Sequence, residues 1–375
     1  MKGKRLLLPA VSLLLIAYAC RQAPEAITCG ACPDEDLTAI TYQPAPYDLA
    51  LPGWMPDPAI PAGNPLTVEG VALGRHLFYD PILSADSTMS CFSCHRQDKG
   101  FTTGTAHSVG VLGEATHRSA PSLVNTVFYG DRLLWDGGAR SIEDIALVAV
   151  ELPVELNEDW DNVLRKLRRS PRYPAMFRRA FGIERRADIT KEMAARAVAQ
   201  FVRSIVSHDA RFDRVIWEND GWLTAAEERG RQLFFLEQLD QTEEHPGCSH
   251  CHFNPLFTNN DFKNNGIEDV ESLADFPDPG RGAVTGNLYD NGRFKVPSLR
   301  NVAATAPYMH DGRYATLSEV LDHYSSGGHG VANEDVNIRP FTLTERQKQD
   351  MIAFLHTLTD STVLTDPALG SPFEE

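Results

Sequence analysis

The sequence predicts a mainly α-helical protein made of two tandem domains that are related by an internal repeat. Three observations lead to this prediction. The five-residue pattern C-x-x-C-H occurs twice, at residues 91–95 and 248–252. Similar segments surround the two copies in the same order along the chain. Amphipathic helical patterns are frequent, whereas the alternating patterns of half-buried strands are few.

The chain begins with a pattern that is typical of a secretion signal. Lys2, Lys4 and Arg5 precede an apolar run that ends at residue 19 and is too short to cross a membrane comfortably. Residues 1–19 are therefore predicted to be a signal peptide, and the mature protein is expected in the periplasm. Cleavage before Cys20 would leave a cysteine for a lipid anchor, although the residues before it match the lipoprotein pattern imperfectly.

The next segment, residues 20–60, is rich in proline and predicts an extended tether. Within it, Cys29 and Cys32 lack a following histidine, so they indicate a disulfide or free thiols and not a third C-x-x-C-H motif. The 375 residues of the whole chain suffice for two domains of ordinary size.

The overall charge excludes some partners and favours others. The formal net charge is −16, and the sequence contains no nucleotide-binding loop, transmembrane helix or basic patch of the kind that binds nucleic acid. An acidic surface suits a cationic redox partner that is guided to it electrostatically.

Each C-x-x-C-H motif predicts the covalent attachment of a c-type haem. The two thiols bind the haem edge, and the adjacent histidine becomes the proximal ligand of the iron. A disulfide and a zinc site are the alternatives, but zinc needs four ligands and no second ligand pair lies beside either motif. The predicted haem residues are Cys91, Cys94 and His95 for haem 1, and Cys248, Cys251 and His252 for haem 2.

The repeat extends well beyond the two motifs and sets the domain boundaries. Matching segments are G-R-H-L-F (74–78) with G-R-Q-L-F (230–234), P-S-L-V-N (121–125) with P-S-L-R-N (297–301), and W-D-G (135–137) with H-D-G (310–312). The sequence thus predicts two cytochrome c-like haem domains, at residues 61–220 and 221–362, followed by a tail at 363–375.

Several local signals place helices within these domains. Thr224-x-x-Glu227 and Thr344-x-x-Gln347 are capping boxes, which start helices. Another helix is expected soon after residue 157, and it ends in a cluster of basic residues. The polar residues 258–295 predict a loop region.

The repeat also predicts the second axial ligand of each iron. The residue fourteen positions after Trp135 is Ala149, and the residue fourteen positions after His310 is Tyr324. Alanine cannot bind iron but tyrosine can, so haem 1 is predicted to be open and haem 2 to be held by Tyr324. A packed aromatic side chain is the alternative role of Tyr324, and Met309 is a competing ligand.

These motifs resemble the bacterial di-haem cytochrome c peroxidase family, which includes the MauG-type enzymes. The resemblance covers about residues 65–360. It rests on C-F-S-C-H, R-S-A-P-S-L-V-N (118–125), L-W-D-G-G (134–138), C-S-H-C-H, F-K-V-P-S-L-R-N (294–301), T-A-P-Y-M-H-D-G (305–312) and A-F-L-H-T-L-T (353–359).

The resemblance implies an activity and two catalytic residues. The family has two helical cytochrome c domains and reduces hydrogen peroxide to water at haem 1, with haem 2 relaying electrons. Trp135 matches the family tryptophan between the haems, although a packed core residue is its other role. Glu155 matches a distal glutamate that moves a proton as the O–O bond breaks.

The sequence departs from the family at several positions. The distal glutamine and proline fall at Ile145 and Ala149, which makes the pocket more apolar, and no histidine lies near Val111 to cap haem 1. Haem 1 is therefore expected to be open in the oxidised enzyme.

The family also binds calcium between its domains. Thr305 and Pro307 match the family's calcium ligands, but Ser119 replaces an asparagine. Calcium is therefore a weaker expectation than the haems. A homodimer is implied by the family alone.

Tyr324 matches the ligand of the MauG-like members, whereas the peroxidases have methionine there. The expected function is a periplasmic peroxidase that takes electrons from a cytochrome c or a cupredoxin. The alternative is a MauG-like enzyme that uses peroxide to oxidise a protein substrate. A non-enzymatic electron carrier is a third function, against which the open face at Ala149 argues.

Overall fold

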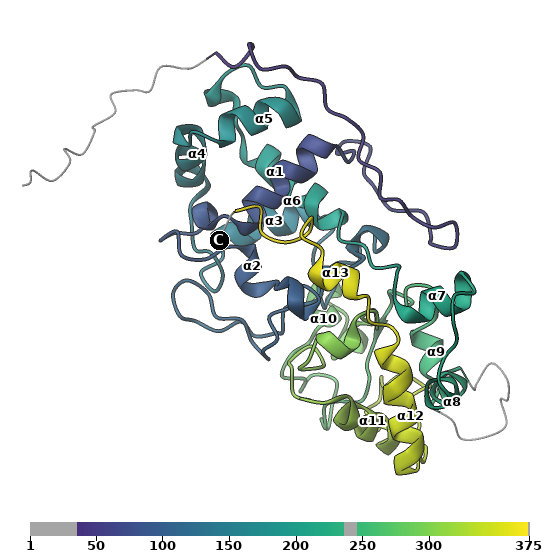
Figure 1. Ribbon diagram of the computed structural model, residues 1–375. Helices are drawn as coiled ribbons and strands as arrows, with labels where there is room; N and C mark the ends of the chain where they lie inside the picture. Colours follow the sequence, from purple (N-terminus) through teal and green to yellow (C-terminus); the bar gives the residue numbers. More distant parts are fainter. Residues whose placement is uncertain (1–35, 236–245, 374–375) are drawn as a thin grey trace, which may run out of the picture.

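The computed structural model describes residues 36–235 and 246–373, and in them helices dominate (Figure 1). The signal segment, Cys20, Cys29 and Cys32 lie outside these residues. None of the described helices is long and apolar enough to span a bilayer. The α-helices are α1 Val68–Tyr79, α2 Cys91–Cys94, α3 Ile142–Glu151, α4 Trp160–Arg169, α5 Tyr173–Phe181, α6 Lys191–Arg203, α7 Arg211–Trp217, α8 Ala225–Phe234, α9 Cys248–Cys251, α10 Arg281–Thr285, α11 Leu317–Ser326, α12 Glu345–His356 and α13 Ser361–Thr365.

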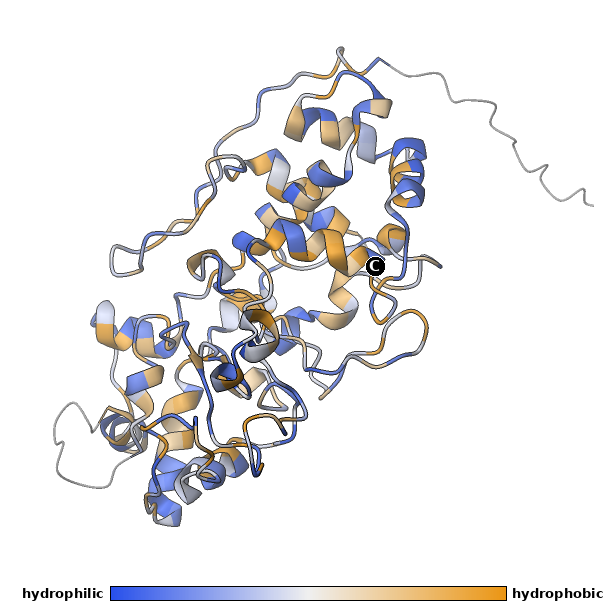
Figure 2. Cartoon of the chain, turned by 180° about the vertical axis from the view of Figure 1, so that it is seen from behind, coloured by the Kyte–Doolittle hydropathy of each residue, from blue (hydrophilic) through white to orange (hydrophobic). Residues whose placement is uncertain are grey.

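The only regular sheet in the described residues is a pair of two-residue antiparallel strands, β1 Phe262–Lys263 and β2 Phe294–Lys295. This confirms the prediction of a mainly helical fold. Helices α1–α6 gather at one end of the molecule and α7–α9, α11 and α12 at the other (Figure 1). The helices carry both polar and apolar faces (Figure 2), as expected for amphipathic helices around a core.

At the first end, α1 crosses α6 at very close range. A Cβ atom built on Gly74 would lie 1.8 Å from the carbonyl oxygen of Ala197, so only glycine fits at this position. Leu77 and Phe201 are fully buried beside the crossing. Removing side chains of this size from water stabilises the fold by about 1.5–3 kcal/mol each.

At the other end, α8 crosses α12 in the same way. A Cβ atom on Gly230 would lie 1.9 Å from the carbonyl oxygen of Asp350. Thr224 and Thr344 accept hydrogen bonds from backbone amides three residues later and start these two helices, which confirms both predicted capping boxes.

Corresponding loops of the two ends share unusual backbone angles. Phe101 and Phe257 have φ of 58° and 54°, and Asn125 and Asn301 have φ of 63° and 62°. Side chains other than glycine rarely adopt this left-handed region. The same strained turns therefore recur at matching places in the two ends.

Both ends of the described chain pack against the helices. Residues 36–60 contain no helix, as the prediction of an extended tether requires, but Leu37 and Met55 are buried. The predicted tail is also attached, because Arg75 of α1 donates a hydrogen bond of 2.7 Å to the carbonyl of Gly370, and Tyr79 donates one of 2.7 Å to that of Leu369. The last residues therefore return to the first end of the molecule.

Candidate haem centres

A cavity of about 880 Å³ lies beside the first C-x-x-C-H motif. Its volume is in the range of pockets that enclose a large organic cofactor. Most lining residues come from the first end of the molecule, but the loop around Asp278 and the strand residue Lys295 also contribute. The lining brings together six of the predicted or compared positions: Cys91, Cys94, His95, Trp135, Ala149 and Glu155.

The thiols of the first motif lie at the two ends of the short helix α2. A spacing of three residues puts Cys91 and Cys94 on the same side of one helical turn. They form no disulfide, and burial raises the pKa of the Cys91 thiol to about 12. A pair of thiols at the wall of a large cavity fits attachment to an organic cofactor.

The two motif histidines are oriented in the same way. Nδ1 of His95 lies 2.8 Å from the carbonyl oxygen of Phe101, and Nδ1 of His252 lies 3.0 Å from that of Phe257. Because a carbonyl oxygen only accepts hydrogen bonds, each Nδ1 carries the proton and each Nε2 keeps a lone pair. Burial lowers both pKa values, that of His252 to about 4, so both rings are neutral and able to bind iron.

The cavity wall beside α3 is apolar apart from one acid. Ile145 and Ala149 of α3 line it, followed by Glu155. Burial raises the pKa of the Glu155 carboxyl. The backbone amide of Val111 donates a hydrogen bond of 2.9 Å to the carbonyl of Glu155. The position where the family's capping histidine would lie is thus next to the acid, and valine occupies it.

Glu155 is held in place by a close backbone contact. A Cβ atom on Gly110 would lie 2.3 Å from the carbonyl oxygen of Val154. Glycine therefore allows the 110–111 loop to approach the segment that carries the acid.

At the second motif, Tyr324 and Met309 lie beside one amide. Nδ2 of Asn265 is 3.4 Å from the hydroxyl of Tyr324 and 3.4 Å from the sulfur of Met309. Burial raises the pKa of Tyr324 to about 12, against the opposing effect of the Asn265 hydrogen bond. Charges on Cys248 and Cys251 also act on this hydroxyl. Tyr324 is therefore close to the second motif.

Sequence reasoning did not identify Asn265. It belongs to the polar stretch that was predicted only as a loop. The Asn-Asn-Gly sequence at 264–266 indicates a turn, and Gly266 does have a φ of 69°. Nothing in that pattern indicates that the turn brings an amide to the two candidate ligands.

Trp135 connects the two ends of the molecule. Its indole nitrogen donates a hydrogen bond of 2.8 Å to the carbonyl of Ser119, and its own carbonyl accepts one of 2.7 Å from the amide of Lys295. Ser119 in turn donates from its amide to the carbonyl of His310 at 2.7 Å. The indole is thus fixed between segments of both ends and at the cavity wall.

The predicted calcium residues lie near this junction. The Ser119 hydroxyl donates a hydrogen bond of 3.0 Å to the carbonyl of Met309, two residues after Pro307. The Thr305 hydroxyl donates to the carbonyl of Val302 at 3.1 Å. The two hydroxyls are therefore engaged within the protein, and the backbone carbonyls of Thr305 and Pro307 are the candidate ligands.

An ion-pair bridge closes the rim of the cavity. Arg118 bonds Asp136 and Asp278, each at 2.6 Å, and the two acids come from different ends of the molecule. Burial opposes ionisation of Asp278, but the hydrogen bonds from Arg118 hold its pKa below the usual value. This bridge positions the polar loop over the cavity.

Lys295 is a second residue that sequence reasoning missed. Its ammonium group lies 3.7 Å from the ring centre of Tyr129, and burial lowers its pKa to about 7. No described carboxylate forms an ion pair with it. An amine whose protonation is disfavoured in the cavity wall would be stabilised in its charged form by an anionic group on the ligand.

Two oriented histidines, each beside a pair of thiols, and a half-buried acid in the cavity of the first motif are the features expected of a haem oxidoreductase. Comparison with known proteins agrees: residues 68–221 match the family described as di-haem cytochrome c peroxidase. The chain belongs to this family, and it is a peroxidase-type oxidoreductase with haem cofactors.

Relatives match most of the chain. The methylamine utilization protein MauG of Methylorubrum extorquens is 36% identical over 315 residues, which cover 82% of this chain and 84% of that protein. A cytochrome-c peroxidase of Denitromonas iodatirespirans is 33% identical over 352 residues, which cover 86% of this chain and 90% of that protein. A crystal structure of a MauG-like protein associated with microbial copper homeostasis is 33% identical, with a TM-score of 0.79, and covers 87% of this chain and 99% of that one.

Proposed function

We propose that this protein is a periplasmic di-haem peroxidase in which the two haems have different tasks. Haem 1 on His95 meets hydrogen peroxide, and haem 2 on His252 and Tyr324 handles the electrons. The observation that carries the proposal is the difference between the two sites. Ala149, which has no ligand atom, shares a cavity with His95 and the half-buried Glu155, whereas Tyr324 lies beside the second motif.

The residues at both motifs fit covalently attached haem. In the first cavity, Cys91 and Cys94 would hold the haem edge and Nε2 of His95 the iron. The carboxylates of the haem would then have Lys295 as a cationic partner, which explains why that buried ammonium has no described acid beside it. The bound haem supplies the redox chemistry, and the protein supplies orientation and proton transfer.

The matching geometry of the two ends supports two tandem haem domains related by a repeat. The glycine crossings at Gly74 and Gly230 and the strained turns at Phe101 and Phe257 are the main observations. Domains of this kind would place the boundary near residue 220, between α7 and α8.

Glu155 would act as the proton carrier at haem 1. A carboxylate can take a proton from one peroxide oxygen and return it to the other, which must leave as water. Burial raises the pKa of Glu155, so its carboxylate is a stronger base than that of an exposed glutamate, and the protonated form is more populated near neutral pH. The apolar side chains of Ile145 and Ala149 around it exclude competing water.

One experiment tests this function. The fully oxidised protein is mixed with one equivalent of hydrogen peroxide, and the haem spectrum is recorded within seconds. We expect rapid spectral changes and, with a reduced small cytochrome c present, oxidation of two cytochromes per peroxide consumed. An unchanged spectrum, together with no binding of carbon monoxide after reduction, would rule out an open peroxidatic haem.

A MauG-like reaction, in which electrons come from the side chains of a protein substrate, is the second candidate. The placement of Tyr324 favours it, because an anionic oxygen ligand lowers the reduction potential of haem 2. A haem of low potential accepts electrons poorly from an ordinary cytochrome c. Slow turnover with reduced cytochrome c or cupredoxin and a long-lived oxidised state after peroxide would favour this second candidate.

A calcium ion bound by the carbonyls of Thr305 and Pro307 is a further part of the proposal. It is supported by the position of Ser119, whose hydrogen bonds hold the first end of the molecule against the 305–310 segment. Chelation should then change the haem spectra, and added calcium should restore them. A homodimer and a lipid anchor at Cys20 remain proposals that sedimentation and mass spectrometry test.

A further inference from the structure

The charge of this acidic protein is very unevenly distributed. Residues 165–191 contain ten lysines and arginines but only two acids, although the whole chain has a net charge of −16. More than a quarter of the 35 cationic residues thus fall within 27 positions. These positions include the second half of α4, all of α5 and the first residue of α6.

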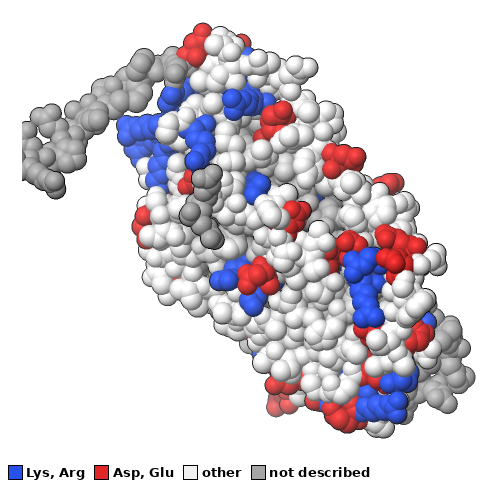
Figure 3. All heavy atoms as spheres, in the orientation of Figure 1, with Lys and Arg blue, Asp and Glu red and all other residues white. Residues whose placement is uncertain are grey.

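Four arginines of this region form what we call the basic face: Arg165, Arg169, Arg172 and Arg179. Helical spacing places the first two on one side of α4 and the last two on one side of α5. All four are exposed. Figure 3 shows blue atoms gathered at the end of the molecule where Figure 1 places α4 and α5.

The basic face concentrates four exposed arginines that have no acidic partner among the described residues. Within residues 36–235 and 246–373, no carboxylate forms an ion pair with any of the four. Elsewhere, most arginines are paired, as in Arg211 with Glu227 at 2.6 Å and Arg229 with Asp350 at 2.7 Å. Concentrated unpaired cations cost free energy by mutual repulsion, which an anionic partner would relieve.

The apolar sides of these helices face inward. Trp160, Val163 and Leu167 of α4 and Phe177 of α5 are buried, and Trp160 also lines the haem 1 cavity. The basic face therefore offers charge to a partner but no apolar surface to insert. Such a surface suits a dense plane of anionic groups more than a hydrophobic protein interface.

The path of the chain identifies that partner. The amide of Leu37 donates a hydrogen bond of 2.7 Å to the carbonyl of Glu184, and Nε of Arg178 donates one of 2.9 Å to the carbonyl of Ile40. The first described residues thus lie against the turn that follows α5. Cys20, the candidate site of lipidation, is only 16 positions before Asp36, a distance of at most about 55 Å when fully extended.

We propose that the basic face binds the anionic phospholipid headgroups of a membrane and sets the orientation of the enzyme on it. The end that holds haem 1 then faces the bilayer. The other end, with α8, α11 and α12, points away and leaves the electron-handling haem accessible to soluble partners (Figure 1). This inference goes beyond the peroxidase activity, and the binding itself does not require the lipid anchor.

The test uses the full-length holoprotein with Cys20→Ala, so that no acyl chain contributes. It is mixed with vesicles of phosphatidylglycerol and phosphatidylcholine, and bound protein is measured by sedimentation. We expect binding to these vesicles but not to phosphatidylcholine alone. Binding should disappear near 1 M salt, where the Debye length is about 3 Å.

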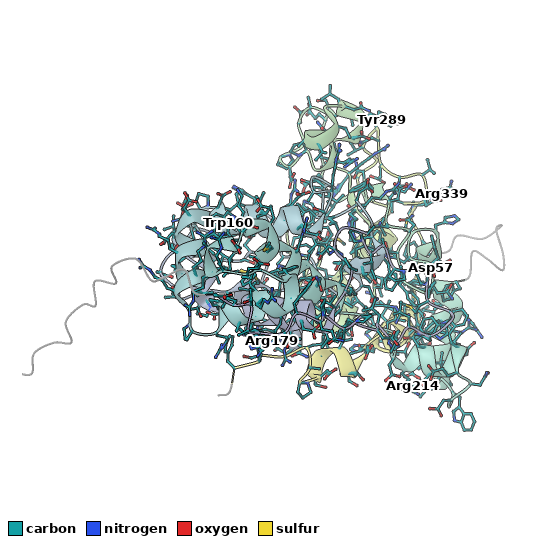
Figure 4. All side chains as sticks on the ribbon, turned by 90° about the horizontal axis from the view of Figure 1, so that it is seen from above. Asp57, Trp160, Arg179, Arg214, Tyr289 and Arg339 are labelled. Atoms are coloured by element: carbon teal, nitrogen blue, oxygen red, sulfur yellow. The ribbon has the colours of Figure 1, made fainter. Side chains whose placement is uncertain are left out.

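A charge-matched pair of variants locates the binding surface. The triple variant Arg165→Gln, Arg169→Gln, Arg179→Gln should weaken binding about 100-fold, because each cation contributes about fivefold. The control is Arg140→Gln, Arg339→Gln, Arg346→Gln, which removes the same charge from other exposed positions. It should retain nearly full binding. Figure 4 labels Arg179 and Arg339 in different parts of the molecule.

Three results would overturn the proposal. They are no binding of the parent protein to anionic vesicles, equal binding to neutral vesicles, and equal losses in the two triple variants. The first result would leave an acidic protein as the partner of this face. Haem absorbance and peroxide turnover, measured in parallel, show that each variant is folded and keep this test separate from that of the peroxidase function.

Discussion

The His95 and His252 sites share the hydrogen bond that orients the imidazole ring but differ in the side chain predicted to face the iron. In both, the ring nitrogen Nδ1 bonds a carbonyl oxygen from a residue with positive φ, Phe101 or Phe257. The opposite sides differ, because Ala149 lines the first cavity and Tyr324 lies beside the second motif. The comparison teaches that the backbone orients both histidines in the same way. The difference between the two sites lies in single side chains on α3 and α11, and on our proposal these give the two centres different tasks.

The largest effect is expected from removing the proposed proton carrier, which only the first site has. Glu155→Gln removes the proton carrier at the first site only, so the rate constant for the reaction with peroxide should fall by about 10²–10⁴. Because the carboxylate form accepts the first proton, the parent rate should rise with pH through the raised pKa of Glu155. Stopped-flow mixing over a range of pH measures both.

The control for this prediction is Glu151→Gln, at the exposed end of α3. It should leave both the rate and its pH dependence unchanged. If Glu155→Gln kept the pH dependence of the parent, another group would be the proton carrier.

The second prediction concerns a difference in the cores of the two ends. Arg300 occupies the position that corresponds to Val124 in the repeat, and it forms a buried ion pair of 2.7 Å with Asp213. Asp213→Asn should lower the free energy of unfolding by about 3–5 kcal/mol, because it leaves a buried charge unpaired. Denaturant unfolding measures this.

Replacing both partners makes the second end resemble the first. Asp213→Val with Arg300→Val should cost less than Asp213→Asn alone, because no buried charge remains. A double variant that is less stable than the single one would show that Arg300 stabilises the fold through its other contacts.

The third prediction sharpens the difference at the iron. Tyr324→Phe should abolish the resonance Raman bands of an iron-bound tyrosinate and raise the reduction potential of haem 2 by something on the order of 100 mV, since an anionic oxygen ligand is lost. Haem 1 should be unaffected. Tyr289→Phe, which changes an exposed tyrosine, is the control. An unchanged haem 2 spectrum in Tyr324→Phe would assign the ligand elsewhere, with Met309 the first candidate.

The smallest expected effects test whether the two helix crossings are equivalent. Gly74→Ala and Gly230→Ala each place a Cβ atom within 2 Å of a carbonyl oxygen, at 1.8 Å and 1.9 Å. Each should destabilise the fold by about 1–3 kcal/mol. Thermal unfolding followed separately at the two haem spectra would show which end loosens. Equal loosening of both haems by either variant would contradict two separately packed ends.

Features that are local or repeated could be predicted from the sequence alone. The capping threonines Thr224 and Thr344 start their helices as predicted, since a cap depends on residues three positions apart. The predominance of helices is confirmed as well. The motif cysteines and histidines could be proposed as haem residues because five adjacent residues specify that chemistry.

Features that depend on distant contacts could not be predicted. Asn265 and Lys295 belong to a polar stretch with only turn signals, and their roles arise because this stretch folds over both motifs. The basic residues of α4 were predicted as a helix end, but the lack of an ion pair at Arg165 and Arg169, in contrast to the pairing of Lys166 with Glu158, is a property of the folded surface. The packing of residues 363–373 against α1 could not be predicted either, because no sequence pattern in this segment indicates it.

That attachment also bears on the order in which contacts form during folding. Arg75 and Tyr79 of α1 donate hydrogen bonds to the carbonyl oxygens of Gly370 and Leu369, which lie 295 and 290 positions further along the chain. A contact of such long range costs loop-closure entropy before it stabilises the fold. The packing of α1 is therefore completed late in folding, after its short-range contacts.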